Sequence, residues 1–203
     1  KKDYTKEQKS EMIKSGGLKE NLPIVLVFGG SQGARAINQT LLDIIKNKKN
    51  SNYQIIWAAG PSQFDVIKEE LADENIDINN IDKVKIVPYI YNMEEIMNAC
   101  DLIIARSGAM TLAEIALAGK PAIFIPLPSK SANRQEDNAR VFEKAGAAKV
   151  ILNQDLNSKI LSDVIEDVIS NKDNLIDMGN RAKNMAIYNV EDKIYEEILK
   201  CCK

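Results

Sequence analysis

Short apolar runs recur along the chain and alternate with stretches in which apolar residues have helical spacing. The first run, Ile24 to Phe28, is uninterrupted and stops at Gly29-Gly30, as expected for a strand that is buried on both faces. Similar runs predict strands at 53–59, 83–87, 102–105, 122–125 and 148–152. Helical spacing predicts helices at 34–47, 63–74, 93–99, 111–117, 135–145 and 158–171. We therefore predict an α/β protein with a Rossmann-like, doubly wound parallel sheet and helices on both faces.

The end of the chain has a different pattern. Strand-like runs cease near Asp173, and helical spacing continues at 173–188 and 192–201. We expect these two helices to pack along the edge of the sheet. The 203 residues are enough to bury the core of one domain, and no internal repeat or low-complexity linker divides them.

Composition mainly excludes classes of protein. Apolar residues make up 45% of the chain and charged residues 28%, which is typical of a folded globular protein. The formal net charge of -2 does not favour nucleic acid as a partner. The three cysteines, Cys100, Cys201 and Cys202, suit neither a disulfide framework nor a zinc site, so we expect a reducing cytoplasm. No apolar run approaches the roughly 20 residues that would span a bilayer.

The first strand ends in a glycine-rich turn, Gly29-Gly30-Ser31-Gln32-Gly33-Ala34. Such a turn lets backbone amides approach a phosphate, and the following helix adds its positive end. Alternatively, the turn only connects strand and helix, with Ser31 as the helix cap. The pattern is not GxGxxG, and Ala58 to Pro61 offers no ribose-binding carboxylate after the second strand, so a dinucleotide site is disfavoured. The Gly-Lys-Ser/Thr ending of a P-loop is also absent.

Two further turns follow the third and fourth predicted strands. The loop from Val87 to Met93 contains Tyr89, Ile90 and Tyr91, which could receive a nucleobase or simply pack against the protein. After the fourth strand, RSGAMTLAE at 106–114 opens a helix, and Glu114 could accept hydrogen bonds from two ribose hydroxyls. Thr111-x-x-Glu114 is equally a capping-box pattern, in which Glu114 bonds back to the helix backbone. The residues alone leave both alternatives open.

A polar loop at 126–139 follows the fifth strand and enters a helix. Gln135 and Asn138 share one helical face, and their amides both donate and accept hydrogen bonds, as sugar hydroxyls require. The alternative is a solvated loop with Asn133 as the helix cap. In a doubly wound sheet all four turns converge at the carboxyl ends of the strands, where ligands bind.

Taken together and in this order, GGSQGA at 29–34, RSGAMTLAE at 106–114, NRQEDNA at 133–139 and EKAGAA at 143–148 resemble the MurG family of glycosyltransferases. The resemblance extends from about Leu22 to the last helix. MurG enzymes have two Rossmann-like domains of the GT-B type, one for the lipid acceptor and one for UDP-N-acetylglucosamine. This chain resembles only the second, C-terminal domain. The resemblance implies that residues 1–20 are the remnant of an interdomain linker, that 21–203 form the donor domain, and that the N-terminal acceptor domain is absent.

The resemblance also implies roles for individual residues. Ser31 would meet a donor phosphate, the backbone of Ile90 would bond uracil, and Glu114 would hold the ribose. Residues 109–111 would approach the pyrophosphate, and Gln135 would bind the sugar hydroxyls. Arg134 departs from the family pattern, because some relatives carry an amide or a histidine there. The complete set of implied substrate-binding residues is Gly30, Ser31, Gln32, Gly33, Ile90, Ser107, Gly108, Ala109, Met110, Thr111, Glu114, Gln135 and Asn138.

The implied reaction is the inverting transfer of N-acetylglucosamine to undecaprenyl-pyrophosphoryl-N-acetylmuramyl pentapeptide in peptidoglycan synthesis. The sequence has no histidine, whereas the suspected base of the family is a histidine of the N-terminal domain. We therefore expect no catalytic residue in this chain and no activity from the chain alone. We also expect no cofactor and no metal ion, because no Asp-x-Asp pattern stands in a plausible position and amides at helix N-termini can stabilise the leaving UDP.

The implied partners are UDP-N-acetylglucosamine and, through the absent domain, the lipid-linked acceptor. Membrane contact would also belong mainly to that domain, which places the full enzyme peripherally on the cytoplasmic face of the bacterial plasma membrane. Two alternatives remain at this point: another GT-B transferase that uses a UDP-sugar, and a nucleotide-sugar-binding module without catalytic activity.

Overall fold

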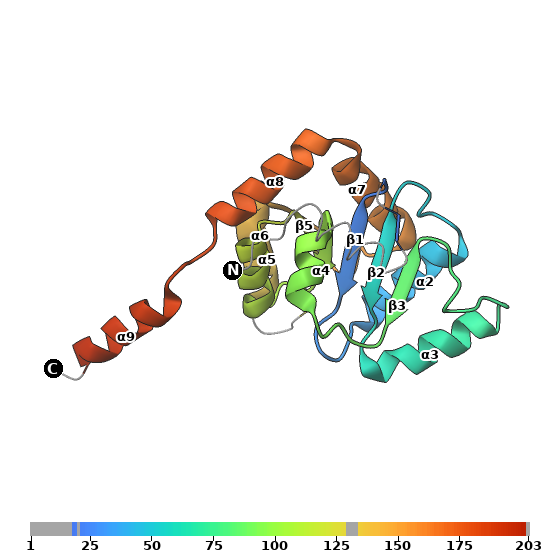
Figure 1. The fold of residues 1–203 in the computed structure, drawn as a ribbon, viewed down its shortest axis with the longest axis horizontal. Helices are drawn as coiled ribbons and strands as arrows, with labels where there is room; N and C mark the ends of the chain where they lie inside the picture. The colour runs from blue at the N-terminus through green and yellow to red at the C-terminus, as the bar shows by residue number, and fades with distance from the viewer. Residues whose placement is uncertain (1–17, 20, 129–133, 202–203) are drawn as a thin grey trace.

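The computed structural model describes residues 18–19, 21–128 and 134–201 and contains one parallel sheet of six strands (Figure 1). The strand order is β3-β2-β1-β4-β5-β6, so the chain moves outward from β1 to one edge and then from β4 to the other. This order confirms the predicted doubly wound, Rossmann-like sheet. The strands are β1 (Ile24–Phe28), β2 (Gln54–Ala58), β3 (Val84–Val87), β4 (Leu102–Ala105), β5 (Ala122–Phe124) and β6 (Ala148–Val150).

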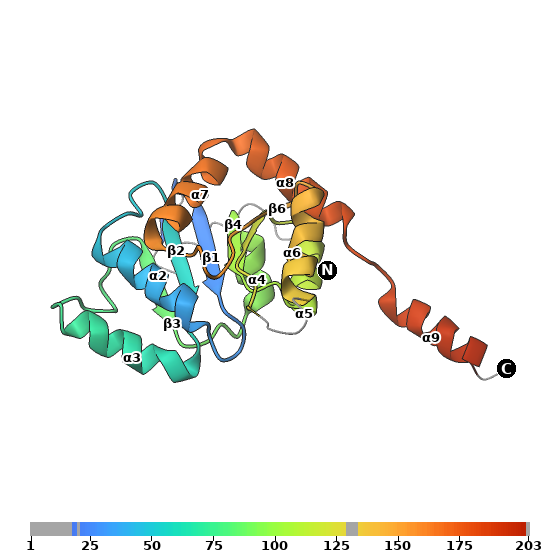
Figure 2. The same ribbon diagram turned by 180° about the vertical axis from the view of Figure 1, so that it is seen from behind.

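Helices cover both faces of the sheet, because each crossover between parallel strands carries one. On the face seen in Figure 2 lie α2 (Arg35–Lys46), α3 (Pro61–Ala72) and α7 (Ser158–Ser170). The other layer of the core is covered by α4 (Met93–Ala99) and α5 (Ala109–Ala118), which lie in front in Figure 1, and by α6 (Arg134–Lys144), whose buried residues belong to the same cluster. The last two helices are α8 (Lys172–Asn184) and α9 (Val190–Cys201).

The core has two layers because alternate residues of each strand point to opposite faces. In β1, Val25 and Val27 belong to the layer under α2 and α7, whereas Ile24, Leu26 and Phe28 belong to the layer under α4 and α5. All five of these side chains are buried, which explains why the strand reads as an unbroken apolar run rather than an alternating one.

Most predicted boundaries agree with the structure to within two residues, and β1, β4 and α4 have the predicted bounds. The helix predicted from Thr111 instead begins at Ala109, directly after Gly108. The predicted end of the helix at Tyr188 was also too late, since α8 ends at Asn184. In the part of the chain that the structure describes, no helix is long and apolar enough to cross a membrane.

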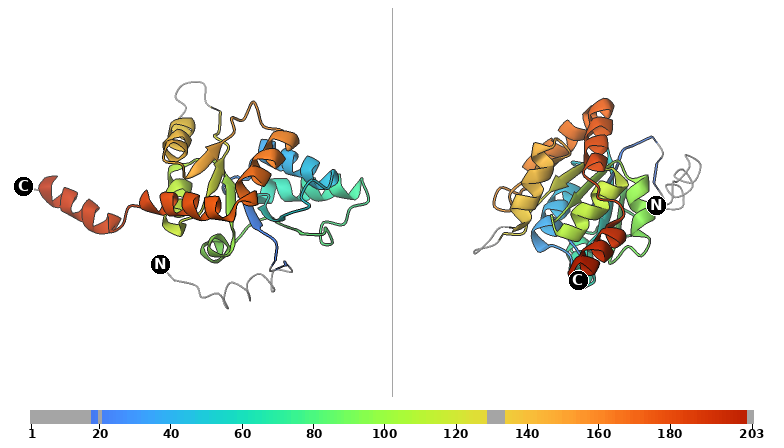
Figure 3. Two further views of the ribbon diagram at one scale, coloured as in Figure 1. Left: turned by 90° about the horizontal axis from the view of Figure 1, so that it is seen from above. Right: turned by 90° about the vertical axis from the view of Figure 1, so that its left-hand side faces the viewer.

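The expectation that both final helices pack along the sheet was only half right. Helix α8 contacts α5 and α7, and Met178 and Ala182 on it are buried. Helix α9 instead projects away from the body (Figure 3) and has no buried residue. Its apolar positions, including Ile194 and Ile198, are therefore exposed, although their helical spacing is that of a helix with a packed face.

Candidate functional site

The predicted turns converge at the carboxyl ends of the strands, next to the point where the strand order reverses. Strands β1 and β4 are neighbours, and Phe28 stands opposite Ala105 in their register. The turn at 29–34 and the turn at 106–108 therefore lie side by side. In open α/β sheets this crevice is the usual place for a ligand.

The first turn is tightly folded and packs against the chain after β2. The amide of Gly33 donates to the carbonyl oxygen of Gly30 at 3.0 Å. Gly33 has a φ of +77°, and a Cβ atom on it would overlap the carbonyl oxygen of Ala59. The same contact leaves no room for a side chain on Gly60, because a Cβ atom there would lie 2.6 Å from the carbonyl oxygen of Gln32. Gly30, Ser31 and Gln32 remain exposed at the tip of the turn.

A buried polar side chain, that of Asn38, stabilises the contact between the first turn and Ala59. Asn38 on α2 donates from Nδ2 to the carbonyl oxygen of Ala59 at 2.8 Å, and its Oδ1 accepts from the indole Nε1 of Trp57 at 3.0 Å. Asn38 is only 1% exposed, so both bonds lie out of water, where an unpaired amide would be costly. Asn38 was not among the predicted site residues, although a polar residue at an apolar helical position was an available signal in the sequence.

Two helices begin at this crevice without a side-chain cap. Helix α2 has Ala34 at its N-cap and α5 has Gly108, and neither N-cap side chain accepts a bond from the first turn of its helix. The alternative of a Ser31 cap is therefore wrong. Among the described residues no side chain caps the amides of either first turn, and an anion is the natural partner of such amides at a helix N-terminus. Gly108 leaves open space for such an approach.

The turn after β4 is bonded to the helix that follows β5. The Ser107 hydroxyl donates to the carbonyl oxygen of Gln135 at 2.6 Å, and Nδ2 of Asn138 donates to the carbonyl oxygen of Ser107 at 3.3 Å. Oε1 of Gln135 accepts from the amide of Leu127 at 3.0 Å. Ser107 and Asn138 were predicted to bind substrate, yet these bonds also give them a positioning function. The proposed Asn133 cap lies outside the described residues.

The loop after β3 places Ile90 beside these turns. The Ile90 side chain is buried in the same cluster as Met97 and Ile56, so a ligand would meet its backbone rather than its side chain. Its neighbours Tyr89 and Tyr91 make an edge-to-face contact with ring centroids 5.1 Å apart, and Tyr91 is 92% exposed. The loop is joined to the chain after β2, because the amide of Gly60 donates to the carbonyl oxygen of Pro88 at 3.1 Å.

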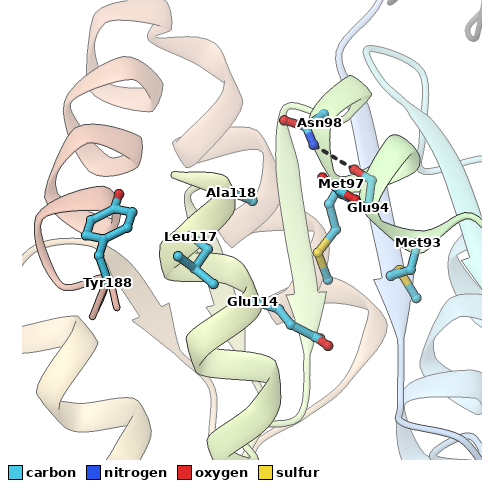
Figure 4. A pocket seen from close by; sticks show the side chains of 8 residues that line it. All are labelled: Met93, Glu94, Met97, Asn98, Glu114, Leu117, Ala118 and Tyr188. Carbon is cyan, nitrogen blue, oxygen red and sulfur yellow. Dashed lines mark hydrogen bonds between the residues drawn. The ribbon is translucent and has the colours of Figure 1, made fainter. Parts of the chain in front are cut away.

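Glu114 lies in a groove of about 390 Å³ between α4 and α5. In Figure 4 its carboxylate projects from α5 toward α4 and Met93, while Leu117 and Tyr188 line the other side. Thr111 is the third residue of α5, and Gly108 is its N-cap, so the capping-box alternative is wrong. The carboxylate is exposed and faces a mostly apolar groove one turn from the uncapped end of α5.

A model of the glycosyltransferase family 28 C-terminal domain matches residues 24–194 of this chain. The chain is also 39% identical, over 198 residues, to a protein of Ruminiclostridium cellulolyticum named UDP-N-acetylglucosamine--N-acetylmuramyl-(pentapeptide) pyrophosphoryl-undecaprenol N-acetylglucosamine transferase. That match covers 94% of this chain and 54% of the relative. A protein of the same name from Thermoanaerobacter sp. is 39% identical over 97% of this chain and 53% of the relative. The chain thus spans about half the length of these relatives.

Two solved structures share the fold of this chain. Acinetobacter baumannii MurG superposes with a TM-score of 0.75 at 27% sequence identity, covering 92% of this chain and 52% of that one. The S. aureus structure described as MnaA-UDP superposes with a TM-score of 0.66 at 11% identity over 96% of this chain and 49% of that one, which shows a shared fold alone. The chain belongs to the glycosyltransferase family 28 C-terminal domain family.

Proposed function

We propose that this chain is the donor-binding half of a transferase that moves N-acetylglucosamine from UDP-N-acetylglucosamine to a lipid-linked muramyl pentapeptide. The observation that carries the proposal is the pair of uncapped helix N-termini, α2 and α5, at the β1–β4 crevice. The names of the most similar relatives describe this reaction. Residues 21–203 would form the donor domain, with the acceptor half outside this chain and residues 1–20 leading from it.

The geometry supports a division of the donor among the turns. Ser31 and the first amides of α2 and α5 would bind the diphosphate, with Gly108 leaving room for it. The Ile90 backbone would bond the uracil, and Glu114, pointing into the groove beside Met93, would bind the ribose. Gln135 would meet the sugar through the part of its amide that is not bonded to Leu127.

In the proposed reaction an acceptor hydroxyl forms a bond to the anomeric carbon as the bond to UDP breaks. The hydroxyl proton must pass to a base, and we place that base in the acceptor half, because this sequence has no histidine and Glu114 is assigned to ribose. The charge that develops on UDP is stabilised by the amides of α2 and α5. Membrane contact at the cytoplasmic face is likewise assigned to the acceptor half.

We expect the chain alone to bind UDP, because all four turns belong to one self-supporting sheet. Addition of millimolar UDP should raise the melting temperature, as for any ligand that binds only the folded state. A calorimetric series of UDP-N-acetylglucosamine, UDP-glucose, UDP, GDP and NAD would define the preference. An unchanged melting temperature with UDP, or equal affinity for NAD, would contradict the proposal.

The substitution Asn138→Ala separates two roles of this residue. Its Nδ2 donates to the carbonyl oxygen of Ser107, so we expect the variant to lose about 1 kcal/mol of stability, the typical net value of one hydrogen bond. A positioning role predicts equal weakening of UDP and UDP-N-acetylglucosamine. Selective loss of affinity for UDP-N-acetylglucosamine would instead indicate a direct bond from Asn138 to the sugar.

A further inference from the structure

Arg106 is a partly buried cation at the same edge of the sheet. It follows β4 directly, and its Nη1 donates to the carbonyl oxygens of Ile125 and Pro126, both at 2.9 Å. Its Nε is buried and has no hydrogen-bond partner in the structure. Among the described residues, no carboxylate forms an ion pair with this side chain. The guanidinium therefore links the carboxyl ends of β4 and β5, and its described hydrogen-bond partners are neutral carbonyl groups.

This arrangement is unfavourable for the protein by itself. Burial lowers the pKa of Arg106, since desolvation penalises the charged form, but a guanidinium remains protonated throughout the ordinary pH range. Buried charges are normally paired, because an unpaired one loses its hydration without compensation. If the only task were to join two carbonyl groups, a neutral amide could perform it. Because no described carboxylate pairs with Arg106, its charge needs another explanation.

The position of the charge suggests one. Arg106 precedes Ser107 and Gly108, so it stands two residues before the uncapped N-terminus of α5. The unpaired guanidinium and the positive end of the helix dipole are thus close along the chain and have the same sign. Both favour a negative ligand in the crevice.

We propose that Arg106 is a positioning residue whose counter-charge is the diphosphate of the bound nucleotide. Its hydrogen bonds fix the carboxyl ends of β4 and β5 relative to each other. Its charge raises the affinity for the phosphates, and its side chain does not contact the base or the ribose. This inference rests on the proposed function, because it assumes that the crevice binds a nucleoside diphosphate.

The test compares a charged ligand with an uncharged one. Dissociation constants of UDP and of uridine are measured for the parent chain, Arg106→Gln and Arg106→Lys, by calorimetry for UDP and by ligand-observed NMR for uridine. We expect Arg106→Gln to weaken UDP by about tenfold or more, as removal of a nearby charge in a partly buried site should. Uridine should change by less than about twofold, because it carries no phosphate. Arg106→Lys keeps the charge and should recover most of the UDP affinity.

The matched control is Arg181→Gln on α8, which makes the same change in net charge. Arg181 pairs with Asp177 at 2.8 Å and lies on the helix at the other end of the sheet (Figure 1). The Arg181→Gln variant should leave the affinities for UDP and for uridine nearly unchanged.

The proposal would be overturned if Arg106→Gln weakened the binding of UDP and of uridine equally, because Arg106 would then be a purely structural link. It would also be overturned if Arg106→Lys bound UDP no better than Arg106→Gln. If Arg106→Gln does not fold, Arg106→Lys decides: affinities for UDP and uridine that fall together would overturn the proposal, whereas UDP affinity close to that of the parent chain would support it. Failure of the parent chain to bind UDP would refute the proposed function itself.

Discussion

Replacing Gly33 with alanine is expected to lower the free energy of unfolding by about 3–5 kcal/mol. The φ of +77° alone costs a residue with a side chain roughly 1–3 kcal/mol. The remainder arises because the new Cβ atom overlaps the carbonyl oxygen of Ala59, a backbone atom that can move only if β2 or the turn moves with it. Urea unfolding followed by circular dichroism measures the change directly.

Gly30→Ala is the matched control for this prediction. Gly30 also has a positive φ, of +90°, but apart from Gly30 and its two chain neighbours no described residue has an atom within 4 Å of the position that a Cβ atom would take. Alanine there should therefore cost only the backbone strain, roughly 1–3 kcal/mol. If the two variants lose the same stability, the contact between the turn and Ala59 contributes nothing, and Gly33 is needed for its backbone conformation alone.

Glu114→Gln is expected to weaken UDP binding by roughly 1.5–3 kcal/mol, the range for a hydrogen bond to a charged group. The amide has one acceptor oxygen fewer and no charge, so it loses the charge-assisted pairing of one carboxylate oxygen with each ribose hydroxyl. The melting temperature without ligand should barely change, because Glu114 is exposed and does not cap α5. Calorimetric titration of both proteins with UDP gives the difference.

The control ligand is 2′,3′-dideoxy-UDP, which lacks the two hydroxyls that Glu114 is proposed to bind. It should bind the parent chain poorly and respond little to the substitution, because the interaction is already missing. An equal loss of affinity for UDP and for the dideoxy compound would remove Glu114 from the ribose site.

The sheet and its helices could be predicted because a strand that is buried on both faces is apolar at consecutive positions, and this pattern is visible in the local sequence. Ile24 to Phe28 is apolar at every position, and the glycines that follow it mark the sharp change in direction. The contacts within the site leave no such record. Ser107 bonds to Gln135, 28 residues later, and Arg106 bonds to Ile125, 19 residues later. Which side chain reaches which carbonyl depends on the order of the strands, and the sequence does not show that order locally.

The two capping alternatives were wrong for a related reason. A cap depends on the first residue with helical dihedral angles, and sequence patterns place helix ends only to within a few residues. Helix α5 begins at Ala109, two residues earlier than its apolar spacing predicts, so Thr111 lies inside the helix. In α9 the apolar spacing correctly predicted a helix, but periodicity records only that a face is apolar and not what covers it.

The buried hydrogen bonds beneath the first turn also connect that turn to an intrinsic fluorophore of the protein. Trp57 is the single tryptophan of the sequence and is fully buried, so its emission reports on one environment. Its indole is joined through Asn38 to the carbonyl oxygen of Ala59, which touches Gly33 in the turn that would meet the phosphates. A movement of that turn is therefore relayed by two hydrogen bonds to the only strong fluorophore. Events in the crevice can be followed in solution without attaching a label.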